Sequence, residues 1–212
     1  MKITKYEHAC LDIEHQGKRL IIDPGVFTTS IPNFDKVAVV VVTHVHPDHL
    51  DTAKLKLILS SNPSVAIFTV QAVGDELRGS VPIKIVSGGD TAKIANFTLR
   101  FYGGQHAPIH KSYPPTDNVG VMVNDKLYYP GDSFTLPDIS VPVLAVPASA
   151  PWLKIGEAID FIKEIKATQV FPTHNAVLSE IGMTINNRLL EAATSSEDGT
   201  YVNLAPGQSL SL

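Results

Sequence analysis

The stretch Val37-Ala38-Val39-Val40-Val41-Val42-Thr43-His44-Val45-His46-Pro47-Asp48-His49 joins a continuously apolar segment to four potential metal ligands. Residues 37–42 are too uniformly apolar for a strand with one face in water, so we predict a strand buried on both faces. In an extended chain His44 and His46 point to the same side and can hold one cation. Pro47 breaks the strand, and the turn can direct Asp48 and His49 toward a second cation. A solvent-exposed histidine-rich loop is the alternative interpretation, but the fixed spacing favours a metal site.

The segments around this stretch predict two β-rich halves, each accompanied by helices. Periods of two and of 3.6 residues separate strands from helices. We expect strands at 3–7, 10–14, 19–23, 37–42, 65–68, 83–86, 91–94, 97–102, 119–123, 127–129, 143–146, 169–171 and 201–204. We expect helices at 52–59, 71–77, 155–165 and 179–193, the second ended by Gly79. Residues 1–212 are therefore predicted to form one α/β domain, a four-layer helix-sheet-sheet-helix sandwich.

Composition restricts the chemistry and the partners. Hydrophobic residues make up 44% of the chain and charged residues 18%, as in an ordinary globular protein. Cys10 is the only cysteine, so a zinc site built mainly from thiolates is excluded and the ligands must be imidazoles and carboxylates. Charged residues interrupt the first twelve positions, so we expect no secretory signal and a cytoplasmic protein without a membrane span. The net charge of -4 argues against a nucleic-acid partner.

The pattern His44-x-His46-x-Asp48-His49 resembles the signature of the metallo-β-lactamase superfamily. Further landmarks of that family follow in order over essentially the whole chain: Leu20-Ile21-Ile22-Asp23-Pro24-Gly25, Gly103-Gly104-Gln105-His106, Tyr129-Pro130-Gly131-Asp132-Ser133 and Phe171-Pro172-Thr173-His174. The resemblance implies one ion held by His44, His46 and His106. It implies a second ion held by Asp48, His49 and His174, with Asp132 bridging the two.

Two assignments within this resemblance stay open. His106 ends the predicted strand 97–102 and is favoured as the third histidine, but His110 lies four residues further in the same loop. His8 lies in Glu7-His8-Ala9, which resembles the Gly-His-Ala element of a subgroup that includes ascorbate-6-phosphate lactonase-like proteins and N-acyl phosphatidylethanolamine phospholipase D. Glu7 departs from the glycine of that element, so His8 is either structural or a residue that supports a ligand.

Several other residues are candidates for supporting the site or contacting substrate. Asp23, at a strand end, can accept a proton from a ligand imidazole and fix its tautomer. Trp152, the only tryptophan, either borders the pocket or packs in the core. Lys111 and Lys154 are cations suited to a substrate phosphate, and His110 would be a rim residue if His106 is the ligand.

The resemblance implies a hydrolase in which two divalent ions activate a bridging hydroxide, with Asp48 and Asp132 in catalytic positions. Zinc suits the ligand set best, and manganese and iron also fit. Diiron electron-transfer relatives typically carry glutamate in place of the second histidine, so His46 favours hydrolysis. The expected substrate is a small ester or lactone that can carry a phosphate.

Two rival interpretations and one open property remain at this stage. A phosphodiesterase or nuclease uses the same kind of site, although the charge of the chain disfavours it. The second rival is a metal-binding protein that is not an enzyme. Such a protein would be expected to lose some of the ligands, whereas the set in this chain is intact. Homo-oligomerisation is compatible with the sequence and is not determined by it.

Overall fold

The computed structural model describes residues 1–212, and two seven-stranded sheets form its centre. The strand order of the first sheet is β14 (Ser209–Ser211), β1 (Lys2–Lys5), β2 (Leu11–His15), β3 (Lys18–Ile22), β4 (Val37–Val42), β5 (Ala66–Thr69), β6 (Lys84–Ile85). The order of the second is β13 (Thr200–Tyr201), β12 (Gln169–Thr173), β11 (Val143–Pro147), β10 (Leu127–Tyr129), β9 (Gly120–Val123), β8 (Phe97–Tyr102), β7 (Thr91–Ile94). Both sheets mix parallel and antiparallel pairs.

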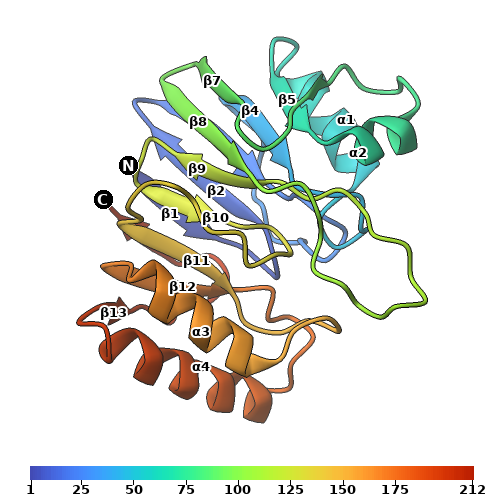
Figure 1. The fold of residues 1–212 in the computed structure, drawn as a ribbon. Coiled ribbons are helices and arrows are strands. Elements are labelled where there is room, and N and C mark those ends of the chain that lie inside the picture. The colour runs from blue at the N-terminus through green and yellow to red at the C-terminus, as the bar shows by residue number, and fades with distance from the viewer.

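Four helices cover the outer faces of the two sheets. They are α1 (Thr52–Ser61), α2 (Gln71–Leu77), α3 (Ile155–Ile165) and α4 (Glu180–Ser195). Figure 1 shows α1 and α2 beside the first sheet and α3 and α4 together on the opposite side of the molecule. The predicted helix-sheet-sheet-helix sandwich is confirmed.

Burial follows these layers. Five of the six residues of β4 are buried, as its uninterrupted valines predict, because the second sheet covers one face and helices cover the other. A larger apolar cluster joins β4 to Leu55 of α1 and Val73 of α2. A smaller cluster packs Phe161 of α3 and Leu190 of α4 against the second sheet. No helix is both long enough and apolar enough to cross a bilayer.

Strand direction determines where the loops gather. β3 runs parallel to β4, and β10, β11 and β12 run parallel to one another. β1 and β8 are each separated from these strands by one antiparallel neighbour, so their ends point the same way. The loops that follow these strands therefore leave from the same edge of the sandwich, where polar side chains can meet.

The observed elements differ from the predicted ones mainly at their ends. The first strand stops at Lys5 instead of residue 7, because the chain turns there to place His8. Helix α2 ends with Arg78 in the left-handed conformation, one residue before Gly79. Strand β14 was not predicted, since its short segment Ser209–Ser211 lacks a buried face and gains order by pairing with β1.

Candidate metal centre

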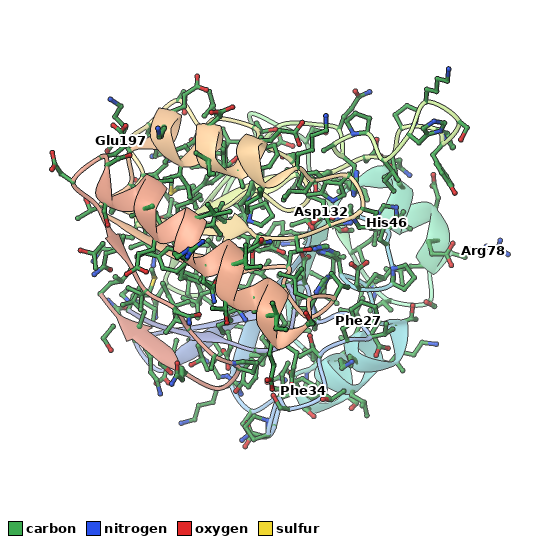
Figure 2. All side chains as sticks on the ribbon, turned by 90° about the horizontal axis from the view of Figure 1, so that it is seen from below. Phe27, Phe34, His46, Arg78, Asp132 and Glu197 are labelled. Carbon is green, nitrogen blue, oxygen red and sulfur yellow. The ribbon has the colours of Figure 1, made fainter.

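The predicted site residues come together at the edge where these loops leave the sheets. Each lies in the loop that follows a strand: Asp23 (β3), His44, His46, Asp48 and His49 (β4), His106 (β8), Asp132 (β10) and His174 (β12). His8 joins them from the loop between β1 and β2. Figure 2 shows His46 and Asp132 near each other, whereas Arg78 and Glu197 lie at the periphery.

A first group of potential ligands consists of His44, His46, His106 and Asp132. Their ligand atoms all lie within 4.8 Å of one another, and all but the half-buried His46 are buried. The Nε2 atom of His106 lies 3.3 Å from Asp132 Oδ2, and that of His44 lies 3.9 Å from the same oxygen. Three imidazoles and a carboxylate form a ligand set suited to a divalent metal.

A second group consists of His8, Asp48, His49 and His174, which meet the same distance limit. Asp48 Oδ2 lies 2.9 Å from His8 Nε2 and 3.3 Å from His174 Nε2. Asp132 lies between the groups, because its Oδ1 is 3.2 Å from His49 Nε2 and its Oδ2 is 3.1 Å from His174 Nε2. Its carboxylate thus contacts imidazoles of both groups.

Hydrogen bonds at Nδ1 fix which imidazole nitrogen faces the centre. His49 Nδ1 donates to Asp23 Oδ2 over 2.6 Å, and His174 Nδ1 donates to the Ser149 carbonyl over 2.6 Å. The neutral rings therefore carry lone pairs on their Nε2 atoms, which lie 3.1 Å apart. Two lone pairs at this distance repel unless a proton or a cation lies beside them.

The first group has the same arrangement. Thr43 Oγ1 donates to Asp23 Oδ2 and accepts from His44 Nδ1 over 3.0 Å, while His106 Nδ1 donates to the Ala107 carbonyl. The Nε2 atoms of His44 and His106 are buried without a hydrogen-bond partner, as is Asp132 Oδ1. Buried polar atoms are normally paired, so these inward-facing acceptors fit bound cations.

Electrostatics of the centre reflect this crowding of acceptors. Burial disfavours charge on His49, yet Asp132 and Asp23 raise its pKa well above the ordinary value. His174 is likewise buried, and Asp132 raises its pKa to about 9. Despite burial, His49 and His174 hold the pKa of Asp132 well below its usual range. Without metal, protons on His49 and His174 therefore supply the positive charge that the carboxylates require.

Asp23 is a buried residue after β3 whose carboxylate binds residues of the loop after β4 and the last residue of β10. Its carboxylate accepts from the Thr43 backbone N–H over 2.8 Å, and from Tyr129 Oη over 2.9 Å. It also accepts from His49 Nδ1, which is a contact of the kind expected for Asp23 from its position at a strand end. A buried carboxylate with four donors holds the imidazole in one orientation and one tautomer.

Backbone conformation at three of these positions is unusual for non-glycine residues. His8, Asp23 and His174 have φ of 60°, 47° and 58°, in the left-handed region. The His174 backbone N–H also donates to the His8 carbonyl over 2.8 Å, which joins the two loops. Such conformations typically cost about 1–3 kcal/mol each and cluster at functional sites. Gly25 is required for another reason, since a Cβ there would lie 1.9 Å from the Asp48 carbonyl oxygen.

Two residues hold Asp132 in place. Trp152 Nε1 donates to Asp132 Oδ2 over 2.7 Å, and the Trp152 ring lies edge-on to His106. Trp152 is therefore buried beside the centre, and its contact with substrate stays a prediction. Asn118 accepts from the Asp132 backbone N–H and donates to the Pro130 carbonyl. Sequence reasoning missed Asn118 because no motif surrounds it.

The remaining candidates lie outside the two groups. His110 is exposed, and its Nδ1 accepts a hydrogen bond from the Ser112 N–H, so the structure brings His106 and not His110 into the centre. Lys111 is exposed in the same loop, and Lys154 is exposed at the start of α3. Neither lysine contacts the clustered side chains by a hydrogen bond or ion pair.

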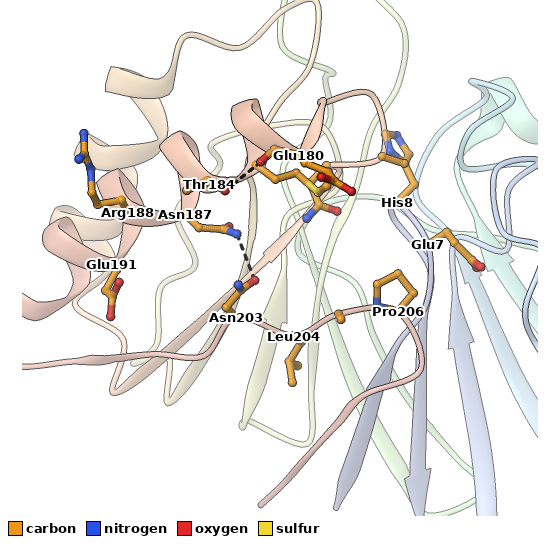
Figure 3. Close-up of a pocket in the computed structure, with 14 residues that line it drawn as sticks. Glu7, His8, Glu180, Thr184, Asn187, Arg188, Glu191, Asn203, Leu204 and Pro206 are labelled. Atoms are coloured by element: carbon orange, nitrogen blue, oxygen red, sulfur yellow. Dashed lines mark hydrogen bonds between the residues drawn. The ribbon is translucent and has the colours of Figure 1, made fainter.

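Two cavities adjoin the centre from different sides. One of about 590 Å³ is bounded by His46, His106 and the loop 105–116. The other, of about 670 Å³, lies between α4 and the segment 203–206 and reaches the centre through His8 and Asn175. Figure 3 shows His8 at one end of this second cavity and Asn203 and Leu204 along its floor.

The helix-sheet-sheet-helix fold and the clustered histidines and aspartates are those of a metal-dependent hydrolase. Residues 2–174 match the family model of the beta-lactamase superfamily domain, so the chain belongs to that superfamily. It is 34% identical to Protein Rv0786c of Mycobacterium tuberculosis, over 92% of this chain and 94% of that protein. It is 27% identical to the UPF0173 metal-dependent hydrolase MJ1163 of Methanocaldococcus jannaschii, over 90% of this chain and 91% of that protein.

Solved structures show the same fold. The metallo hydrolase Igni18 from Ignicoccus hospitalis superposes with a TM-score of 0.77 at 18% identity, over 99% of this chain and 97% of that one. At this identity the likeness supports the fold alone. The relatives support membership of the superfamily and a similarity to the UPF0173 metal-dependent hydrolases. Membership of the ascorbate-6-phosphate lactonase-like subgroup stays a prediction.

Proposed function

We propose that this protein is a hydrolase with a dinuclear metal centre that acts on small esters or lactones. His44, His46 and His106 would hold one ion, and Asp48, His49 and His174 the other, with Asp132 between them. The observation that carries this proposal is the 3.1 Å separation of the His49 and His174 Nε2 atoms, whose Nδ1 atoms both donate elsewhere. Bound divalent ions would supply an acidic water molecule and polarise the carbonyl oxygen of a substrate.

The two aspartates would have different roles. The side chain of Asp48 is 22% exposed, whereas that of Asp132 is 3% exposed. Asp48 can therefore meet a substrate and transfer a proton to the leaving group, while Asp132 holds the two groups of ligands together. His8 would position Asp48, because its Nε2 lies 2.9 Å from Asp48 Oδ2.

The identity of the metal follows from the ligand chemistry. Imidazole and carboxylate ligands suit zinc, and they also accept manganese or iron. We propose zinc as the resident metal because the first group offers three imidazoles and one carboxylate, a set typical of zinc hydrolases.

The experiment is a turnover assay on protein loaded separately with zinc, manganese or iron. Small esters, lactones, thioesters and phosphodiesters would be tested, and we expect turnover of the acyl compounds. His46→Ala should abolish it with an unchanged circular dichroism spectrum, whereas His15→Ala, a matched substitution outside both groups, should retain it. Full turnover by His46→Ala would contradict the proposal, and a preference for phosphodiesters would replace the substrate class.

A further inference from the structure

The loop between β8 and β9 forms one wall of the cavity beside the first group of ligands. This segment projects beyond the strand ends in Figure 1, and residues 105–116 enclose about 590 Å³ together with His46. His46 and His106 line the cavity and also belong to the metal centre. A molecule in the cavity therefore has one end at the ligands and the rest against the loop.

The loop is held in shape by its own contacts. Gln105 and Asp117 form a bridge at its base, and the His106 N–H donates to the Thr116 carbonyl over 3.0 Å. Near its tip the Tyr113 N–H donates to the His110 carbonyl over 2.9 Å. Pro108, Pro114 and Pro115 further restrict its backbone. The cavity is thus largely pre-formed, as small-molecule sites usually are.

Apolar side chains of the loop lie exposed around the cavity. Ile109 is 38% exposed and Tyr113 is 63% exposed, and the three prolines add flat apolar surface. Exposed apolar groups that line a hollow are typical of ligand contacts. A cavity of this volume beside a polar centre fits an apolar group the size of one or two rings.

The charge of the cavity is opposite to that of the chain. None of its lining residues is a carboxylate, whereas Lys111 lines it in a chain of net charge -4. His110 adds a donor, because its Nδ1 accepts from the Ser112 N–H over 3.2 Å and the neutral ring then carries its proton on Nε2. An ammonium and an N–H donor at the rim suit an anionic group on the ligand.

We infer that this loop cavity selects substrates in which the scissile acyl group is joined to an apolar, ring-sized group that ends in an anion. The inference rests on the proposed function for the position of the scissile group. Ile109 and Tyr113 contact the apolar part, and Lys111 and His110 contact the anion. These residues are specificity-determining and take no part in bond cleavage.

Binding of two matched probes to the zinc-loaded protein tests this assignment by isothermal titration calorimetry. Naphthalene-2-sulfonate carries an anion that is a poor metal ligand, and methyl 2-naphthyl sulfone is its neutral counterpart. We expect the sulfonate to bind about three- to fivefold more tightly, the effect of one partly exposed charge contact. Lys111→Ala should remove this difference, whereas Lys93→Ala, an exposed lysine of β7, should retain it.

A second pair of variants tests the contact between Ile109 and the apolar part of the ligand. Ile109→Ser should weaken both probes, whereas Ile181→Ser, which changes the 74% exposed isoleucine of α4, should weaken neither. Equal binding of the two probes to the wild type, or equal effects within either pair of variants, would overturn the inference. Because binding needs no turnover, a sulfonate preference without hydrolysis would count against the proposed function alone, and hydrolysis without the preference would count against this inference alone.

Discussion

The Nε2 atoms of His49 and His174 lie 3.1 Å apart, while the Nδ1 atom of each ring donates to an oxygen on the opposite side. The two residues are far apart in sequence and come from loops of different sheets. Neutral imidazoles in this arrangement direct two lone pairs at each other. Positive charge is therefore required between the rings, either as protons or as metal.

Metal binding should release protons. In the metal-free protein the pKa values of both His49 and His174 are raised, the latter to about 9, so this pair of rings binds proton at pH 7. A metal ligand must be deprotonated, so binding of zinc should release at least one proton and strengthen as the pH rises. Calorimetric titrations in two buffers of different ionisation enthalpy measure this number. A binding heat that is independent of the buffer would contradict the assignment.

Asp23→Asn should weaken metal binding although Asp23 contacts the Nδ1 atom of His49 and not the Nε2 atom that faces the centre. The amide replaces one acceptor oxygen by an NH2 group, which then faces either the Thr43 backbone N–H or the donors that share Oδ2, His49 Nδ1 among them. Loss of such a supporting contact typically lowers metal affinity about 10- to 100-fold. Competition with a fluorescent zinc chelator measures the affinity. Asp125→Asn, which changes an exposed carboxylate paired with Arg100, is the control and should leave the affinity unchanged.

Trp152→Phe should also weaken metal binding, by about tenfold, because it removes the N–H donor that orients Asp132. In the wild type, Trp152 is the only tryptophan, so its fluorescence reports directly on the centre. Titration with Co²⁺ should quench this fluorescence in the wild type and not in His46→Ala at the same concentration. Identical quenching in both proteins would place the bound Co²⁺ elsewhere.

Lys5 provides a test of stability that is separate from the metal. Its side chain is fully buried, with contacts of 3.3 and 3.4 Å to the Asn175 amide oxygen and the Tyr6 carbonyl, and burial lowers its pKa to about 8. The folded pKa lies below the unfolded value of 10.5, so the ammonium destabilises the fold at pH 7. That cost diminishes as the pH rises from about 8 to 10.5.

Lys5→Met should therefore raise the free energy of unfolding at pH 7, by at most about 3 kcal/mol. Urea unfolding at pH 7, 8 and 9.5 should show the gap between variant and wild type becoming smaller at the highest pH. A gap that is the same at all three values would show that the ammonium carries no burial cost.

Much of this architecture could be predicted from local sequence. The valines of β4 indicated a strand covered on both faces, and the histidine spacing after Val42 placed ligands at its end. The position of His8 could not be derived, because it depends on a left-handed turn and on contact with the loop after β12. The contacts of Asn118 and Trp152 with Asp132 could not be predicted either, because they join loops that are separate in the sequence and share no motif.

Two cations should bind at two adjacent groups of side chains on either side of Asp132. Anomalous diffraction at the zinc absorption edge, from crystals of zinc-loaded protein, tests it most directly. We expect two peaks, one among His44, His46 and His106 and one among Asp48, His49 and His174. A single peak, or peaks outside these residues, would contradict it.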